Sequence, residues 1–231
     1  MGISNAGAIA ASYGSVSAVT FVTAVSFLEL EALSYNGHMV AVMAFMEVPA
    51  IIVGVLLINY FKSGSSKLNM NVSGLISHSV TNGSVFLIIG SLLIGFLASP
   101  EQAQGIKPFT TDIFKGFLAI FLLDMGLSSG KQLSSIMKKG ISPFLFSSFM
   151  PFLHGLLALL IASQITDSQG NQLLFAILGA GASYIAVPAA MKQAVPDSNP
   201  SIYLPMALGI TFPINVMLGI PFYYWLIVSF T

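Results

Sequence analysis

The feature that most constrains this chain is an octapeptide that occurs twice. Residues 11–18 (ASYGSVSA) and residues 182–189 (ASYIAVPA) are identical at five of eight positions, 171 residues apart. Both copies are small, hydroxyl-bearing and interrupted by Gly14 or Pro188, in apolar surroundings where a continuous hydrophobic helix would be expected. The repeat therefore predicts two interrupted helices that face each other across one binding site.

The composition indicates that the solvent around these helices is a lipid bilayer. The chain is 55% hydrophobic and 7% charged, with a mean hydropathy of +0.89, whereas soluble domains are about 25% charged. Eight basic and eight acidic residues give zero net charge, which argues against nucleic acid as a partner. The absence of cysteine excludes disulfides and thiolate metal sites.

Apolar stretches long enough to cross a bilayer, about 20 residues each, predict an all-α polytopic membrane protein with seven transmembrane segments. The first segment is interrupted near residues 13–17 and the sixth near residues 184–188. Polar residues 62–79 form a linker that we expect to be cytoplasmic. The seven segments are residues 4–28, 39–61, 80–98, 113–136, 141–162, 173–194 and 202–230.

Lysine placement supports this orientation, because cytoplasmic loops carry an excess of basic residues. With the linker inside, six lysines are cytoplasmic and two, Lys107 and Lys115, are on the other side. The cytoplasmic lysines are Lys62, Lys67, Lys131, Lys138, Lys139 and Lys192.

The predicted topology implies that the two copies of the octapeptide belong to an inverted repeat. Four segments separate the first from the sixth, so these two cross the membrane in opposite directions. Because the first segment corresponds to the sixth, each repeat unit has five helices. Residues 80–231 are then a complete second unit, and residues 1–61 are the last two helices of a first unit. We therefore expect seven of ten helices here. Either the sequence is an N-terminally shortened product that lacks the other three, or another polypeptide supplies them.

The interrupted helices predict a site for a small anion. A helix that restarts inside the bilayer presents unpaired N–H groups and the positive end of its dipole. Small residues also let helices approach closely, so a helix-packing seam is the alternative. The candidate anion-binding residues are Tyr13, Gly14, Ser15, Val16 and Ser17 in the first copy, and Ser183, Tyr184, Ile185 and Ala186 in the second.

Glu47 needs a partner, because a charge at the bilayer centre costs about 2.5–3.5 kcal/mol. The partner is a sodium ion, a hydroxyl, or backbone N–H groups freed at Pro49; a protonated or hydrogen-bonded structural Glu47 is the alternative. Ser12, Thr211 and Asn215 offer uncharged oxygens of the kind that hard cations accept.

The other titratable residues have simpler interpretations. We expect Asp124 to be structural, Glu29 and Glu31 to face water at a helix end, and His38 and His154 to be isolated, without a metal pair. The chain has no zinc-protease, nucleophile-elbow or phosphate-loop motif. The sequence therefore predicts neither an enzyme nor an organic cofactor.

Five motifs together resemble the sodium-dependent bicarbonate transporter family. They are residues 12–21 (SYGSVSAVTF), 37–44 (GHMVAVMA) with 47–54 (EVPAIIVG), 121–127 (FLLDMGL), 182–191 (ASYIAVPAAM) and 207–213 (ALGITFP). The resemblance implies ten helices in two inverted five-helix units, of which this chain is similar to helices four to ten.

The resemblance also implies a function: sodium-coupled symport of bicarbonate across the plasma membrane. Bicarbonate would lie between the two broken helices, and sodium would bind nearby oxygens and Glu47. A homotrimer and a PII-like regulatory protein are the partners it implies. Two alternatives stay open, a carrier of the same architecture for another small anion and a truncated or non-transporting membrane subunit.

Overall fold

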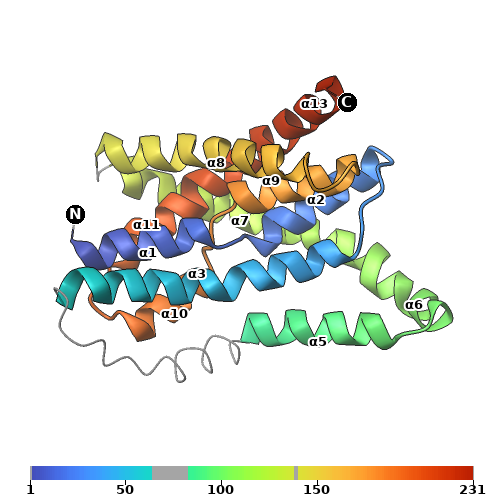
Figure 1. The fold of residues 1–231 in the computed structure, drawn as a ribbon, viewed down its shortest axis with the longest axis horizontal. Helices are drawn as coiled ribbons and strands as arrows, with labels where there is room; N and C mark the ends of the chain where they lie inside the picture. Colours follow the sequence, from blue (N-terminus) through green and yellow to red (C-terminus); the bar gives the residue numbers. More distant parts are fainter. Residues whose placement is uncertain (1, 64–82, 138–139, 231) are drawn as a thin grey trace.

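The computed structural model describes residues 2–63, 83–137 and 140–230, and these residues form helices without any β-strand. Most of the helices lie side by side along the long axis of the molecule (Figure 1). Their bounds are α1 (Ile3–Gly14), α2 (Ala18–Leu30), α3 (His38–Ser63), α5 (Gly83–Leu97), α6 (Pro100–Lys107), η1 (Pro108–Ile113), α7 (Phe114–Met137), α8 (Ile141–Ala162), α9 (Gln169–Ala180), α10 (Ala186–Ala194), α11 (Pro200–Met206), η2 (Ala207–Thr211), α12 (Phe212–Ile214), η3 (Asn215–Gly219) and α13 (Ile220–Phe230).

Five helical stretches among the described residues are long and apolar enough to cross a membrane. They are Ile3–Leu30, His38–Phe61, Pro100–Leu133, Ile141–Ala162 and Pro200–Phe230. Two of the seven predicted segments, residues 80–98 and 173–194, are not among them. Residues 80–82 of the third segment lie outside the described residues, and the described helix α5 has 15 residues. The sixth segment is divided into α9, with 12 residues, and α10, with 9.

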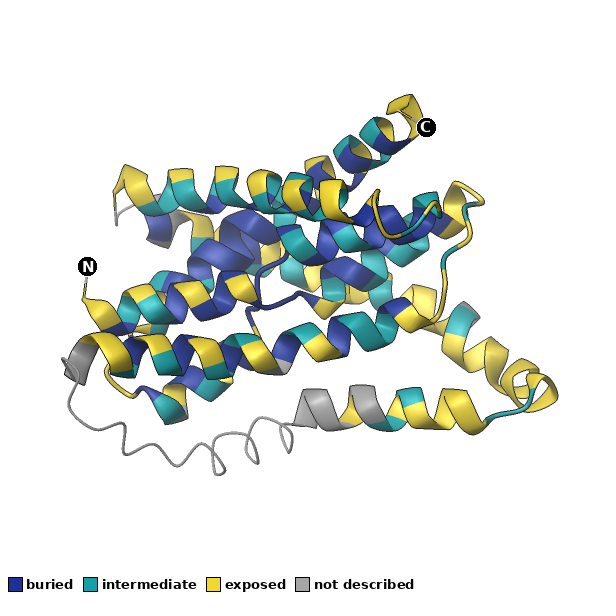
Figure 2. Cartoon of the chain, in the orientation of Figure 1, coloured by how far each residue is buried: buried dark blue, intermediate teal, exposed yellow. Residues whose placement is uncertain are grey.

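Two pairs of helices are separated by short non-helical segments at the repeated octapeptides. Helix α1 ends at Gly14 and α2 begins at Ala18, whereas α9 ends at Ala180 and α10 begins at Ala186. The two pairs run in opposite directions, with α1 packed against α10 and α2 packed against α9 (Figure 1). Nearly all residues of the connecting segments are buried (Figure 2).

Helix α8 has the side-chain distribution of a helix that faces lipid on one side. Phe149, Leu153, Leu157 and Leu160 follow one face at helical spacing and are exposed. The buried positions of α8 are small or polar instead: Ser147, Pro151, Gly155 and Ala162. Membrane helices use small residues for close packing, because lipid solvates the large apolar ones.

The fourth predicted segment begins earlier than expected. We predicted residues 113–136, but the helix is continuous from Pro100 through α6, η1 and α7 to Met137. It starts in a capping box, where the Ser99 hydroxyl accepts from the Gln102 N–H and the Gln102 side chain accepts from the Ser99 N–H. The polar first turns obscured this start, because hydropathy marks only the apolar part of a helix.

Several predictions lie outside the described residues. Residues 64–79 of the expected linker are among them, whereas residues 62 and 63 belong to α3. Lys67, Lys138 and Lys139 also lie there, so three of the six lysines expected on the cytoplasmic side have no described position.

Helices α1 and α3 approach each other closely at Gly54. A Cβ at this position would lie 2.5 Å from Ala11 Cβ and 3.3 Å from Ala11 Cα, and a buried backbone cannot move aside as a flexible side chain can. Gly54→Ala should therefore lower the free energy of unfolding by about 1–3 kcal/mol. Gly126→Ala on α7, where a Cβ meets nothing within 4 Å, should be neutral or stabilising by about 1 kcal/mol. Thermal unfolding in detergent measures both, and equal midpoints would contradict the close approach.

Candidate functional site

The two helix breaks contact each other through the backbone. The Ser183 N–H donates a hydrogen bond to the Ser12 carbonyl, with a nitrogen-to-oxygen distance of 2.8 Å. These two serines occupy the same position of the repeated octapeptide. At Gly181, a Cβ would lie 3.1 Å from the Ser17 nitrogen, so the segments cross with no room for a side chain between them.

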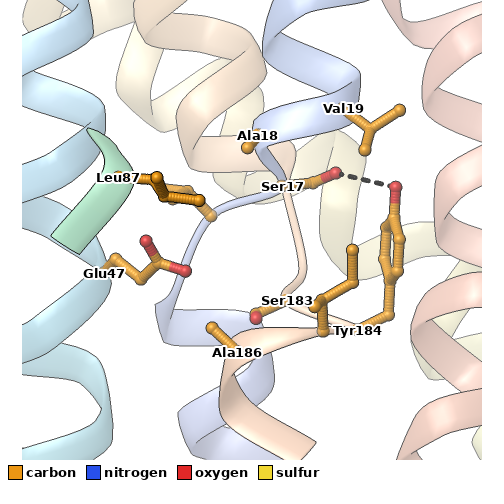
Figure 3. Close-up of a pocket in the computed structure, with 10 residues that line it drawn as sticks. Ser17, Ala18, Val19, Glu47, Leu87, Ser183, Tyr184 and Ala186 are labelled. Carbon is orange, nitrogen blue, oxygen red and sulfur yellow. Dashed lines mark hydrogen bonds between the residues drawn. The ribbon is translucent and has the colours of Figure 1, made fainter. Parts of the chain in front are cut away.

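A cavity of about 250 Å³ lies beside this crossing. Residues from both breaks line it, and α3 and α5 contribute one residue each (Figure 3). The lining residues are Val16, Ser17, Ala18, Val19, Glu47, Leu87, Ser183, Tyr184, Ile185 and Ala186.

Two helices begin at the cavity wall. Ala18 is the first residue of α2 and Ala186 the first residue of α10, and both line the cavity. The first N–H groups of a helix have no partner within the helix and carry the positive end of its dipole. Ser17 and Ser183 satisfy one N–H group each, that of Thr20 at 3.2 Å and that of Val187 at 3.1 Å. The remaining N–H groups make this wall favourable for an anion.

Glu47 projects from α3 towards the two breaks (Figure 3). The residue is only 6% exposed. Within residues 2–63, 83–137 and 140–230, no hydrogen bond or ion pair to its carboxylate is found, and no lysine or histidine lines the cavity. The cavity thus has hydrogen-bond donors on one side and a buried carboxylate on the other.

A hydrogen bond between Ser17 and Tyr184 joins the two breaks beside the cavity (Figure 3). The Ser17 hydroxyl accepts from both the N–H and the hydroxyl of Thr20. It donates its own proton to the Tyr184 hydroxyl oxygen at 3.3 Å. The Tyr184 proton therefore has no acceptor among the described residues and is free to bond a solute.

Tyr13 occupies the equivalent position in the first octapeptide but points elsewhere. Its hydroxyl oxygen lies 2.8 Å from Thr211 Oγ1, and Thr211 donates its proton to the Ser147 carbonyl at 2.8 Å. Because the Thr211 proton is already used, Tyr13 is the donor in its bond to Thr211. The Tyr13 ring packs edge-on against Phe146, with ring centroids 5.0 Å apart. These contacts fix the end of α1 against α8 and η2.

Three buried oxygens near the breaks have no hydrogen-bond partner in the described part of the chain. They are Ser12 Oγ, Ser15 Oγ and Asn215 Oδ1. The Asn215 amide nitrogen donates to the Ala180 carbonyl at the end of α9, at 2.7 Å, which leaves its oxygen unused. Buried polar atoms are normally paired, so these three oxygens are candidates to coordinate a bound cation.

The predicted site residues divide into two groups by position. Six of the predicted anion-binding residues line the cavity, together with Glu47 from the predicted sodium set. They are Val16, Ser17, Ser183, Tyr184, Ile185 and Ala186. Tyr13, Gly14 and Ser15 lie outside the lining, as do Ser12, Thr211 and Asn215. At Gly14 a Cβ would meet only Ala50 at 3.8 Å, so this position does not require glycine for space.

Sequence reasoning missed three residues of the cavity wall. Ala18 and Val19 follow directly from the first octapeptide, and extending the motif into the helix that it starts would have included them. Leu87 comes from α5, and nothing in its local sequence distinguishes it from other apolar residues of that helix.

Among the described residues, Glu47 is the only acidic one in the cavity lining. Glu29 is exposed, as predicted, and also pairs with Lys115 at 2.9 Å. Glu31 is exposed and accepts a hydrogen bond from Tyr224 at 2.9 Å. Asp124 lines an apolar groove between α2 and α7, which adjoins the cavity at Ala18 and Val19. No group of three metal-ligating residues occurs among the described residues.

Two consecutive hydrogen bonds connect Tyr13 to Thr211 and Thr211 to Ser147. We therefore expect substitutions at Tyr13 and Thr211 to have non-additive effects on stability. Tyr13→Phe should lower the free energy of unfolding by about 1 kcal/mol, because one hydrogen bond is lost. Thr211→Val should cost about 1–3 kcal/mol, because it leaves the buried Tyr13 hydroxyl without its acceptor. The double variant should cost less than the sum of the two. Chemical unfolding in detergent gives these values, and strict additivity would show that the two hydroxyls do not interact.

Comparison with known proteins agrees with the architecture described above. A search of curated proteins finds no match. A family model described as the Na⁺-dependent bicarbonate transporter superfamily matches residues 1–228, which is nearly the whole chain. With five candidate spans and a family of membrane carriers, the protein is a multi-pass membrane protein. The chain belongs to the Na⁺-dependent bicarbonate transporter superfamily.

Proposed function

We propose that this chain performs sodium-coupled symport of bicarbonate across the plasma membrane, with the anion in the cavity between the two helix breaks. One observation carries the proposal: two helix N-termini, at Ala18 and Ala186, begin at the wall of one cavity of about 250 Å³. Transporters use the N-terminal ends of interrupted helices for anionic groups of their substrates. As a carrier, the protein binds and releases bicarbonate unchanged.

The anion would be held mainly by backbone and hydroxyl donors. Ser183 and Tyr184 each line the cavity and keep a hydroxyl proton that no described residue accepts. A site without lysine or arginine binds an anion less tightly than one with a full positive charge. Moderate binding suits a carrier, because the solute must also leave.

Sodium would bind the oxygens that have no partner in the protein. Leaving a buried oxygen unpaired costs about 1–3 kcal/mol, and Ser12, Ser15 and Asn215 each have one. Oxygen atoms are the ligands that hard cations prefer. Thr211, also predicted as a sodium ligand, already contacts Tyr13 and Ser147, which makes it a weaker candidate than Ser12 and Asn215.

Coupling follows from the electrostatics of a buried site. An anion in a low-dielectric environment is costly unless an opposite charge lies nearby. A sodium ion beside the breaks offsets part of the desolvation cost of the anion, and the anion offsets part of the desolvation cost of the sodium ion. Each solute therefore increases the occupancy of the other, and neither crosses well alone.

The repeated octapeptides support an inverted repeat as the basis of transport. Helices α1–α2 and α9–α10 run in opposite directions, and Ser12 and Ser183 occupy equivalent positions at their crossing. We propose that these four helices move together with α3, which packs against α1 and α10 and carries Glu47, as a core against the other helices. The homotrimer and the PII-like partner stay predictions from family resemblance.

The full chain in proteoliposomes should take up labelled bicarbonate only when sodium is present outside. Replacing external sodium with potassium or choline should reduce uptake to the level of empty vesicles, because the anion then has no counter-ion in the site. Rapid filtration of the vesicles measures the uptake. Equal uptake in choline would contradict sodium coupling.

Ser12→Ala distinguishes a sodium ligand from a packing residue. Removing an unpaired buried hydroxyl should leave stability without sodium unchanged or raise it by about 1 kcal/mol, while the sodium-induced rise in the unfolding midpoint should shrink. Ser148→Ala is the control, since the Ser148 hydroxyl is satisfied by the Phe144 carbonyl within α8. A full sodium shift in Ser12→Ala would exclude Ser12 as a ligand.

A further inference from the structure

Glu47 is an unexpected residue in the wall of an anion site. The residue is buried, at 6% exposure, and lines the same cavity as the two helix N-termini, and its carboxylate has no partner among the described residues. Two negative groups in one buried cavity repel each other unless something lies between them. The arrangement therefore restricts which anions the cavity accepts.

We propose that Glu47 accepts a hydrogen bond from the O–H group of the bound anion, and thereby selects oxyanions that carry their own proton. This inference rests on the proposed function, because it concerns the same cavity. Bicarbonate is such an anion near neutral pH: it has one O–H group and two oxygens that share the negative charge. Glu47 would accept from the O–H, while the opposite wall donates to the charged oxygens.

The opposite wall has the required donors. Ser17 accepts two hydrogen bonds from Thr20 and donates to Tyr184, so the Tyr184 proton is available for the solute. Ser183 accepts from the Val187 N–H, which leaves the Ser183 proton available as well. Figure 3 shows Glu47 on one side of the cavity and Tyr184 on the other, with Ser183 between them.

Nitrate is the informative comparison, because it matches bicarbonate in charge, planar shape and number of oxygens but has no proton. In this cavity a nitrate oxygen would face the Glu47 carboxylate with no hydrogen between them. A buried site that is built to bond a solute hydroxyl discriminates strongly against an analogue that lacks it. Rejection through an unpaired or repulsive contact is a general means of specificity.

The first measurement uses the unaltered full chain in proteoliposomes with sodium outside. Nitrate should inhibit labelled-bicarbonate uptake at least about tenfold less effectively than unlabelled bicarbonate does. Equal inhibition by nitrate would overturn the inference without any variant. Absence of sodium-dependent bicarbonate uptake would instead overturn the proposed function, and the inference with it.

The second measurement uses Glu47→Gln. The glutamine amide has a donor as well as an acceptor, so bicarbonate should still bind, and nitrate should now compete about tenfold or more better than in the unaltered chain. Glu31→Gln is the matched control, because Glu31 is exposed and bonded to Tyr224 away from the cavity; its nitrate selectivity should not change.

Two results from Glu47→Gln would contradict the inference. One is bicarbonate uptake with unchanged rejection of nitrate. The other is a large rise in the sodium concentration needed for half-maximal uptake with the same rejection of nitrate, which would make Glu47 a sodium ligand instead.

If Glu47→Gln does not fold, as shown by aggregation in size-exclusion chromatography, Tyr184→Phe takes its place. It should weaken bicarbonate and nitrate equally, and a change in their ratio would contradict the assignment of Glu47 as the selecting residue.

Discussion

The structure depends on one requirement of the bilayer, that irregular backbone be satisfied inside the protein. Each octapeptide interrupts a helix, and the freed backbone groups need partners where water is scarce. The hydrogen bond from the Ser183 N–H to the Ser12 carbonyl provides one directly between the two breaks. The first octapeptide thus supplies an acceptor and the second a donor, so each satisfies one backbone group of the other at the crossing. The cavity lies beside this crossing, where α2 and α10 begin at Ala18 and Ala186.

The side chains around the crossing have different tasks although their sequences repeat. Tyr13 and Tyr184 occupy equivalent octapeptide positions, yet Tyr13 bonds Thr211 outside the cavity whereas Tyr184 lines the cavity and bonds Ser17. One tyrosine thus anchors a break to the surrounding helices, and the other forms part of the cavity wall. An internal repeat of this kind gives related folds to its two copies without giving them the same contacts.

The sequence predicted the parts of the fold that depend on local chemistry. Each octapeptide contains a non-helical segment, and the fifth predicted segment, residues 141–162, coincides with α8. The second interruption lies at residues 181–185 and not at the predicted residues 184–188, because Pro188 is accommodated in the first turn of α10. Contacts between distant segments were not predictable. The acceptor for Tyr13 lies 198 residues away, and Leu87 reaches the cavity only because α5 packs against α3. Periodicity and composition indicate which face of a helix is buried, but not which residue of another helix it meets.

The position of Leu87 separates two parts of the cavity wall. The donors and the carboxylate of the cavity come from α2, α3, α10 and the segments before them, whereas α5 contributes a single apolar side chain. The two polar contacts between the breaks, from Ser183 to Ser12 and from Ser17 to Tyr184, do not involve α5. The apolar cover of this wall and its hydrogen-bonding groups therefore belong to different helices, so a substitution at Leu87 changes the size of the cavity without removing a donor or the carboxylate.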